Sequence, residues 1–499
     1  MEKQIKYFFI KYSKNKELLV FLLTFIFATI LLCFTKMRFP NDDQFILYRY
    51  IDNIASGNGF VFNIGERVLG ATTPLFTLIA AFFKFLFFDA DTPFLVACLN
   101  IIFLSFSSVY FFRLAQRFLS KELVFLSLFV FIFSMSRTIP EGMETPLFLW
   151  LVFAFLNNLF DKKFSISAVY LGLVCLTRPD AGLIAVMAFV YWLLQDGYKK
   201  AFKYTLVAVS VVVPWIIFAV FYFGSFVPQS LATKTFSHLI YNIAPLQGFK
   251  VQISSVSRIY WGRIFDPDNI FLQIIFNLVP IVFLVTMAVY KKINKNNWIL
   301  FAIPFVYMLS FSISNPIIFP WYVSQMEPFW ILLSLIGIGL IFVKIQDHRW
   351  KVLLMFVLLI GPASYWLKSS FFANSSSKTS AFEVSSFIKK NMNSNADSVG
   401  LADIGIVGYY TNAHILDFIG LVKGESVHFY PGRVDGCHNP TELYVVPSDL
   451  IKTYKPKFLV ASDNTMDSCF IKSDWFLNNY NFVFQSGGAK VWQVVQKSI

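Results

Sequence analysis

The residues best suited to chemistry in this sequence are two adjacent aspartates, Asp42 and Asp43, which follow the first long apolar run. Two neighbouring carboxylates near a surface of low dielectric raise the pKa of one of them unless a cation compensates. Such a carboxylate can accept the proton of a sugar hydroxyl, while its neighbour orients a group or pairs with a cation. The pair therefore predicts a general base. The alternative is a solvated loop with two ordinary aspartates.

Charged residues at three later positions have types that bind phosphate or sugar groups. Arg178 offers a planar fork to phosphate oxygens, and Lys234 offers a point charge on a long stem. Glu144 either stabilises the start of a helix through its dipole or faces a substrate. A lysine that reaches the membrane interface along its stem is the structural alternative for Lys234.

A turn-rich loop follows the aspartate pair and ends in Glu66 and Arg67. Glycine and asparagine recur through residues 57–65, which is typical of tight turns. The loop predicts either a pocket wall or a structural hairpin, and the residues alone leave both open.

The composition requires that most of these residues are positioned by membrane helices. Hydrophobic residues make up 57% of the chain and charged residues 14%, whereas soluble domains contain roughly 25% charged residues. The net charge of +13 suggests nucleic acid, but the basic residues mostly flank apolar runs, as the positive-inside rule describes. We therefore expect a polytopic α-helical membrane protein and no nucleic-acid partner.

The positions of the basic residues predict the topology. Residues 18–34 form the first expected span, with a cytoplasmic N-terminus. Segment 72–88 is short and contains Lys84, so we interpret it as a helix along the outer interface. All the basic loops then lie inside, and the spans number about eleven. The later spans are expected at 93–112, 121–136, 145–160, 164–178, 180–195, 203–223, 270–290, 298–314, 320–343 and 350–368.

This topology gathers the unusual polar residues on the outer side. They are Asp42, Asp43, Arg49, Glu66, Arg67, Glu141, Glu144, Arg178, Asp180, Lys234, Trp321 and Tyr322. Ionisable groups at membrane depth are costly and usually mark function. We expect a membrane body over residues 1–369, with outer loops 36–92 and 224–268, and chemistry on its outer side.

Residues 370–499 have the composition of a soluble domain, about 130 residues long. Strand-like runs at 398–404, 414–418 and 457–461 alternate with helical segments, and a hairpin is expected across 481–495. This alternation predicts a small extracytoplasmic α/β domain. Asp403 lies at the end of the first strand, where open α/β sheets place ligands, and Asp417 ends the second.

The five cysteines divide between the two parts. Cys33, Cys98 and Cys175 lie in apolar runs and are expected to pack as small apolar residues. Cys437 and Cys469 are the two in the tail, and a disulfide between them is compatible with an extracytoplasmic domain. The sequence leaves that pairing open.

An ordered series of motifs resembles the GT-C superfamily of membrane glycosyltransferases, in particular bacterial relatives of the mycobacterial terminal arabinofuranosyltransferase. The series extends from residue 42 to about residue 421. It comprises Asp42-Asp43 with Arg49-Tyr50, Gly57-x-Gly59, Asn63-x-Gly65-Glu66-Arg67-Val68, Thr72-x-Pro74, Gly142-x-Glu144-Thr145, Thr177-Arg178-Pro179-Asp180, Pro228 through Lys234, Trp321-Tyr322, Asp403-x-Gly405 and Asp417-x-x-Gly420-Leu421. Gln229-Ser230 departs from the family's Asn-Thr, which puts the contacts to the donor sugar in doubt.

The resemblance implies an inverting transfer from a polyprenyl-phosphate sugar to an acceptor hydroxyl on a glycan, lipid or protein of the cell envelope. Asp42 would act as the base, with Asp43 as its partner or replacement. Arg178 and Lys234 would hold the donor phosphate, whose charge grows as the glycosyl bond breaks. The remaining candidates for substrate binding are Arg49, Glu66, Arg67, Glu144, Asp180, Trp321, Tyr322, Asp403 and Asp417.

The resemblance also implies a multi-pass protein of the bacterial cytoplasmic membrane, in contact with membrane lipid. Some relatives use a divalent metal, but we favour a metal-independent reaction because no acidic cage accompanies Asp42 and Asp43. The main alternative is a transporter or flippase of lipid-linked sugars, although no internal repeat is evident. A glycan polymerase or ligase and a non-catalytic scaffold remain further alternatives.

Overall fold

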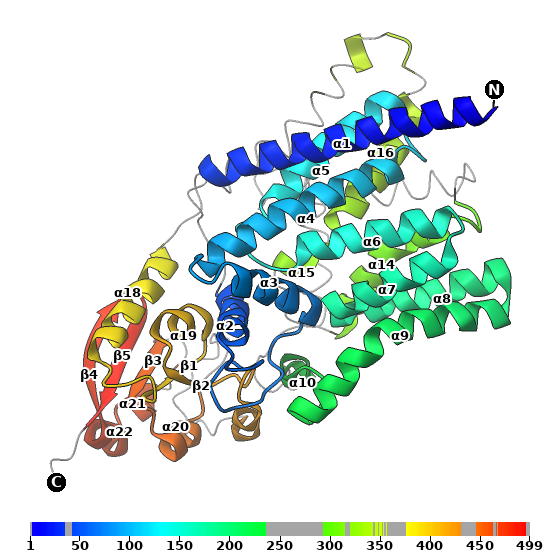
Figure 1. Cartoon of the computed structure of the whole chain (residues 1–499). Coiled ribbons are helices and arrows are strands. Elements are labelled where there is room, and N and C mark those ends of the chain that lie inside the picture. The colour runs from blue at the N-terminus through cyan, green and yellow to red at the C-terminus, as the bar shows by residue number, and fades with distance from the viewer. Residues whose placement is uncertain are drawn as a thin grey trace. The chain divides into compact units, whose positions relative to one another are not determined.

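The computed structural model describes residues 2–34, 42–235, 293–314, 320–342, 345–347, 349–351, 353, 356, 376–430, 446–462, 466 and 468–495. The chain divides into two compact units, each formed from separate stretches of sequence (Figure 1). Unit 1 contains residues 1–39, 94–214 and 245–373, and unit 2 contains residues 40–93, 215–244 and 374–499. The tail expected at 370–499 thus groups with the first outer loop.

Unit 1 is built from apolar helices whose bounds mostly lie within three residues of the expected spans, apart from earlier starts at Glu2 and Tyr198 in place of residues 18 and 203. They are α1 (Glu2–Phe34), α4 (Thr92–Ala115), α5 (Lys121–Ser136), α6 (Thr145–Phe160), α7 (Phe164–Thr177), α8 (Gly182–Asp196), α9 (Tyr198–Phe223), α14 (Trp298–Ser314), α15 (Pro320–Ser324) and α16 (Glu327–Phe342). A 3-10 turn, Pro179–Ala181, separates α7 from α8. The first residues of α4 and the last of α9 belong to unit 2.

One expected helix is divided. We predicted a continuous helix over 320–343, but α15 ends at Ser324 and α16 begins at Glu327. Pro328 lacks a backbone N–H and cannot donate to the carbonyl four residues before it, which favours a break at this point.

Four described segments are long and apolar enough to cross a membrane. They are Asn15–Cys33, Thr92–Ala115, Tyr198–Phe223 and Tyr322–Leu340. The expected spans 270–290 and most of 350–368 lie outside the described residues. The count of about eleven spans therefore stays a prediction.

Helix ends in unit 1 that the expected topology assigns to the cytoplasmic side contact one another in two places. Arg117, after α4, pairs with Asp161, after α6, at 2.5 Å. Tyr191 and Gln195 of α8 donate hydrogen bonds to the backbone carbonyls of Asn296 and Lys295, before α14. Loops that the charge pattern assigns to one side thus contact one another in pairs.

Unit 2 contains a five-stranded mixed sheet in the order β2-β1-β3-β5-β4. The strands are β1 (Ser398–Leu401), β2 (His414–Asp417), β3 (Phe458–Ser462), β4 (Tyr480–Ser486) and β5 (Ala489–Val494). β1 pairs in parallel with β2 and β3, and β5 is antiparallel to β3 and β4. The α/β domain predicted from alternating strand and helix patterns is confirmed.

The helices of unit 2 are short. They are α2 (Asp43–Ala55), α3 (Pro74–Leu86), α10 (Gln229–Thr235), α18 (Ser376–Asn391), α19 (Gly405–Thr411), α20 (Ser448–Tyr454), α21 (Ser468–Ile471) and α22 (Asp474–Asn479), with a 3-10 helix at Gly424–Phe429. An apolar core that includes Leu459, Phe476 and Trp492 joins α20–α22 to the sheet.

Helix α3 corresponds to the segment that we expect along the outer interface. Its 13 residues span about 20 Å, which is short for a hydrocarbon core of about 30 Å. Leu78, Phe82 and Phe85 are exposed, while Thr77 and Ala81 are buried. An exposed apolar face on a short helix favours the interfacial interpretation.

The state of the cysteines in the described part differs between the two units. Cys33, Cys98 and Cys175 are free, and Cys469 is disulfide-bonded. Cys437, the partner considered in the sequence analysis, lies outside the described residues.

Candidate active site

The topology of the sheet in unit 2 marks the end of β1 as a ligand position. The chain leaves β1 through α19 to β2 on one side, and the next strand, β3, lies on the other side of β1. In open α/β sheets, ligands bind outside the carboxyl ends of the strands where the order reverses in this way. Asp403 lies two residues beyond β1 and is exposed, so it stands at this position.

The carboxylate of Asp42 reaches the same point. Its Oδ2 accepts a hydrogen bond from the backbone N–H of Gly405 at 2.6 Å, and its Oδ1 accepts one from Ile406 at 2.7 Å. Asp42 occupies the N-cap position of α2 but makes no side-chain bond to that helix. It caps α19 instead, 363 residues along the chain.

The surroundings of Asp42 suit a base that works near neutral pH. Burial and the nearby charge of Asp403 raise the pKa of Asp42 to about 7, against the lowering effect of its two backbone hydrogen bonds. The protein around the Asp403 carboxylate reduces its hydration and so raises its pKa, although the residue keeps contact with solvent. Each oxygen of Asp42 keeps a second lone pair, so the carboxylate can accept a proton without leaving α19.

Asp43 differs from Asp42 in its position. It is the first residue of α2 and is half-buried. A negative charge in the first turn of a helix is stabilised by the helix dipole. The helix dipole thus provides a structural reason for the negative charge of Asp43.

Gly405 permits the close approach of Asp42. A Cβ at this position would lie 1.9 Å from the backbone oxygen of Asp42 and 2.8 Å from its Oδ2. We expect Gly405→Ala to lower the free energy of unfolding by about 3 kcal/mol or more, because backbone atoms cannot move aside as a flexible side chain can. Thermal unfolding of the purified protein measures the effect.

Gly488→Ala is the matched control, since nothing lies within 4 Å of a Cβ at Gly488. Equal unfolding temperatures for the two variants would contradict the close contact between Asp42 and Gly405.

Arg49 holds α2 against α19 and β2. Its Nη1 donates to the carbonyl of Gly408 at 2.9 Å, and its Nη2 donates to the carbonyl of Ala413 at 2.7 Å. The guanidinium also lies 4.3 Å from the ring centre of Phe62. These contacts within unit 2 give Arg49 a structural role, whereas its expected role in substrate binding stays a prediction.

Asn63 attaches the turn-rich loop to the edge strand β2. Its Nδ2 donates to the carbonyl of Ile415, and its Oδ1 accepts from the N–H of the same residue, both at 2.9 Å. The side-chain amide thus makes the bonds that a neighbouring strand would make. This geometry favours the structural interpretation of the loop.

Glu66, the acidic residue of this loop, contacts one basic residue in β2 and another after it. It pairs with His414 at 3.1 Å and lies 3.7 Å from Lys423. The hydrogen bonds of His414 and Asn63 and the charge of Lys423 lower the pKa of Glu66 to about 2, although burial opposes them.

A carboxyl group whose pKa is lower in the folded than in the unfolded state stabilises the fold at pH values above its unfolded-state pKa. This stabilisation disappears as the pH falls to the folded-state pKa. Glu66→Gln should therefore lower the free energy of unfolding by about 1 kcal/mol at pH 6, since the pair is partly exposed. The difference should shrink between about pH 4.5 and pH 2. Chemical unfolding of wild type and variant across this range measures it, and a difference that grows below pH 4.5 would contradict the sign. Exposed Glu425→Gln is the control.

The other expected ligands in unit 2 have separate surroundings. Asp417 is fully buried and accepts backbone hydrogen bonds from Ile419 and Val422, and burial raises its pKa to about 6. Arg67 is exposed, with its guanidinium 4.6 Å from the ring centre of Tyr222. The side chain of Lys234 lies outside the described part of the structure.

In unit 1, the structure brings together three of the predicted residues. Arg178 is buried and donates from Nη1 to Glu144. It also pairs with Asp180, at 2.9 Å through Nη2 and at 3.0 Å through Nε. Gln325 donates to Asp180 at 3.1 Å, and Tyr307 donates to its backbone carbonyl at 3.0 Å. The fork that we expect to hold phosphate is already used by two carboxylates.

Sequence reasoning missed a second buried ion cluster in unit 1. Arg137 pairs with Glu327 and lies 4.0 Å from Glu141. Glu141 was noted only as an outer charge, and Arg137 and Glu327 were not singled out. The position of Glu327 before a proline inside an apolar run was the available signal.

Of the two expected aromatic ligands, Tyr322 stacks on Phe311 with ring centres 6.0 Å apart. The side chain of Trp321 is not among those that the structure describes. Over the described residues, no group of three or more histidine, cysteine, aspartate or glutamate side chains could hold a metal ion. Both metal-dependent and metal-independent reactions stay open.

Comparison with known proteins identifies the fold. None of the curated proteins matches the chain. A family described as a domain of unknown function (DUF8728) matches residues 372–496. The crystal structure of ArnT from Cupriavidus metallidurans bound to undecaprenyl phosphate is similar at 11% identity and a TM-score of 0.59, over 98% of each chain. ArnT from the same organism in the apo state has 12% identity and a TM-score of 0.55, over 94% of this chain and 97% of that chain. The chain therefore has the fold of ArnT, a GT-C glycosyltransferase, as the motif series predicts.

Proposed function

We propose that this protein is a GT-C-type glycosyltransferase that moves a sugar from a polyprenyl-phosphate donor to an acceptor hydroxyl. The reaction takes place at the outer face of the bacterial cytoplasmic membrane, and the acceptor is a glycan, lipid or protein of the cell envelope. The observation that carries the proposal is Asp42, whose raised pKa and position at the carboxyl end of β1 suit a general base. The ArnT fold and the undecaprenyl phosphate bound in one ArnT structure support the donor class.

The proposed reaction inverts the anomeric carbon. The acceptor hydroxyl loses its proton to the Asp42 carboxylate, and its oxygen bonds to the anomeric carbon on the face opposite the phosphate. The bond between that carbon and the phosphate oxygen breaks, and polyprenyl phosphate leaves with the electron pair. A base with a pKa near the working pH takes this proton efficiently.

The proposed topology follows from the same assignment. Residues 370–499 are extracytoplasmic and, with the first outer loop, carry Asp42, Asp43 and Asp403. Residues 1–369 form the membrane body, with outer loops 36–92 and 224–268. Arg178 and Lys234 remain the candidates for binding the donor phosphate, and Glu144 remains a candidate for binding sugar or acceptor.

The purified protein in proteoliposomes, supplied with isotope-labelled polyprenyl-phosphate sugars and envelope extracts, tests the proposal. Mass spectrometry should detect a labelled glycoside and free polyprenyl phosphate, and both should vanish when Asp42 and Asp43 are changed to alanine. Wild-type transfer by a folded double variant would overturn the mechanism. Movement of the labelled lipid across the bilayer without a new glycosidic bond would identify the transporter or flippase instead. Glycan analysis of a deletion strain would then identify the missing sugar.

A further inference from the structure

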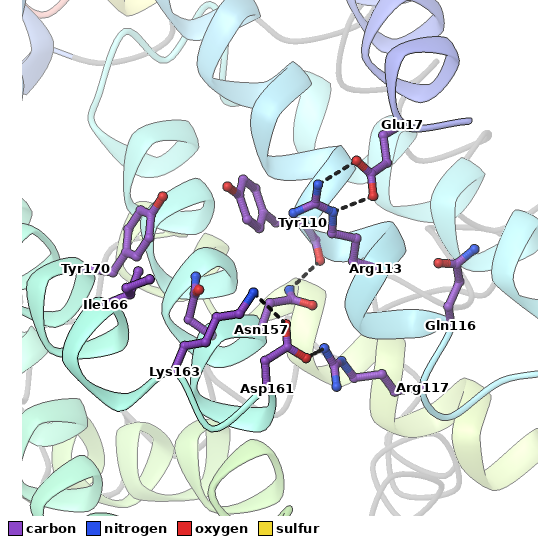
Figure 2. A pocket seen from close by; sticks show the side chains of 11 residues that line it. Glu17, Tyr110, Arg113, Gln116, Arg117, Asn157, Asp161, Lys163, Ile166 and Tyr170 are labelled. Atoms are coloured by element: carbon purple, nitrogen blue, oxygen red, sulfur yellow. Dashed lines mark hydrogen bonds and ion pairs between the residues drawn. The ribbon is translucent and has the colours of Figure 1, made fainter. Parts of the chain in front are cut away.

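A polar pocket of about 690 Å³ lies in unit 1, among α1, the end of α4 and the turn between α6 and α7 (Figure 2). Its charged side chains are Glu17, Arg113, Arg117, Asp161 and Lys163. The expected topology places all of these residues on the cytoplasmic side.

The pocket is distinct from the Arg178 cluster. Glu144, which binds Arg178, immediately precedes α6, and Asp161, in the pocket, immediately follows it. The 16 residues of α6 extend about 24 Å, so the two groups lie at opposite ends of one helix.

Cations exceed anions in the pocket. Glu17 binds Arg113 through both oxygens, at 2.7 and 2.5 Å. Asp161 serves two cations, since it lies 2.5 Å from Arg117 and 3.9 Å from Lys163 (Figure 2). Three positive charges therefore face two negative ones. Arg117 and Lys163 share one carboxylate, so they can pair with an added anion while losing the least of their existing ion pairing.

Arginine and lysine side by side are well suited to phosphate oxygens. The guanidinium offers parallel N–H donors, and the ammonium offers a mobile point charge. Gln116 and Asn158 also line the pocket and provide amide donors. An anion with several oxygens fits this set better than a single carboxylate does.

The lining of the pocket includes one aliphatic side chain, and a second aliphatic residue follows Glu17 in α1. Ile166 lines the pocket with an exposed fraction of 50%, and Leu18, next to Glu17, is 58% exposed. Lipid tails are as apolar as leucine, so exposed side chains of this kind on membrane helices can contact acyl chains. A phosphate that carries acyl chains matches both surfaces, whereas free phosphate matches only the charges.

We propose that this pocket binds the phosphate of an anionic membrane lipid, with Arg117 and Lys163 as its principal ligands and Ile166 and Leu18 beside the acyl chains. Binding connects the end of α4 to the turn between α6 and α7. It does not depend on the proposed transfer reaction, because it uses none of the residues of the candidate active site.

Native mass spectrometry of the purified full chain in detergent tests this proposal. Wild type should retain phosphatidylglycerol in preference to phosphatidylcholine, and Arg117→Gln with Lys163→Gln should weaken this binding about tenfold or more. Lys199→Gln with Lys200→Gln is the matched control, since it removes the same charge from the exposed first turn of α9, outside the pocket. The control should bind as wild type does.

A second variant keeps the proposal testable even if the double variant misfolds. Ile166→Glu adds a negative charge at the exposed rim and leaves the ion pairs in place, so it should also repel phosphatidylglycerol. Full retention of the lipid by both pocket variants would overturn the proposal, as would equal losses in the control. Displacement of the lipid by millimolar inorganic phosphate would identify a free-phosphate site and overturn the lipid assignment.

Discussion

Asp42→Asn is expected to lower kcat/KM for sugar transfer by a factor of about 10² to 10⁴ while the protein remains folded. The amide oxygen of asparagine can still accept one backbone hydrogen bond from α19, so most of the local structure should survive. The amide cannot take the proton of a hydroxyl. The loss of activity would therefore report the chemistry of the carboxylate.

The pH dependence provides a sharper test of the same residue. Because the pKa of Asp42 is raised to about 7, kcat/KM should rise with pH and level off above about pH 7. The negative charge of Asp403 contributes to that raised pKa. Asp403→Asn should consequently move the rising part of the profile to lower pH.

Asp43→Asn is the matched comparison, since it removes the neighbouring carboxylate. We expect a smaller effect, because Asp43 lies in the first turn of α2, where the helix dipole accounts for its charge. If Asp43→Asn abolished transfer and Asp42→Asn did not, the base would be Asp43. If Asp403→Asn left the profile unmoved, the electrostatic explanation of the raised pKa would be wrong.

The sequence predicted the helices of unit 1 well because their limits are local. Charged residues and prolines bound the apolar runs, so the expected bounds 121–136 and 145–160 agree with α5 and α6. The strands of the tail were predicted for a similar reason, since apolar runs end in glycine turns. The break between α15 and α16 was missed because the hydrophobic pattern continues across it.

The candidate site could be predicted only in part, because its contacts join distant parts of the chain. The types of Asp42 and Asp403 indicated chemistry, but no local pattern shows that Asp42 caps a helix 363 residues later. The partners of Asn63 and Arg137 are equally remote. Residue type and a strand end indicate a position for a ligand, whereas the contacts between segments depend on the three-dimensional fold.

Removal of the guanidinium of Arg178 is expected to have the largest effect on stability. Arg178→Met would leave Glu144 and Asp180 without the cation that they share, and Glu144 is 2% exposed. An unpaired buried carboxylate costs about 3–5 kcal/mol when its partner is removed. Arg117→Met is the control, because the side chains of that arginine and Asp161 are 32% and 40% exposed and such pairs contribute at most about 1 kcal/mol.

Arg178→Lys separates the structural role of Arg178 from its proposed role at the donor phosphate. A single ammonium cannot reproduce the three N–H contacts to Glu144 and Asp180, so the unfolding temperature should fall even though the charge is kept. Adding Glu144→Leu to Arg178→Met removes one stranded carboxylate and should recover part of the loss. Thermal unfolding in detergent measures all four variants. Additive losses in the double variant would contradict the pairing. Normal stability of Arg178→Lys with lost transfer would mean that the guanidinium acts on the donor phosphate.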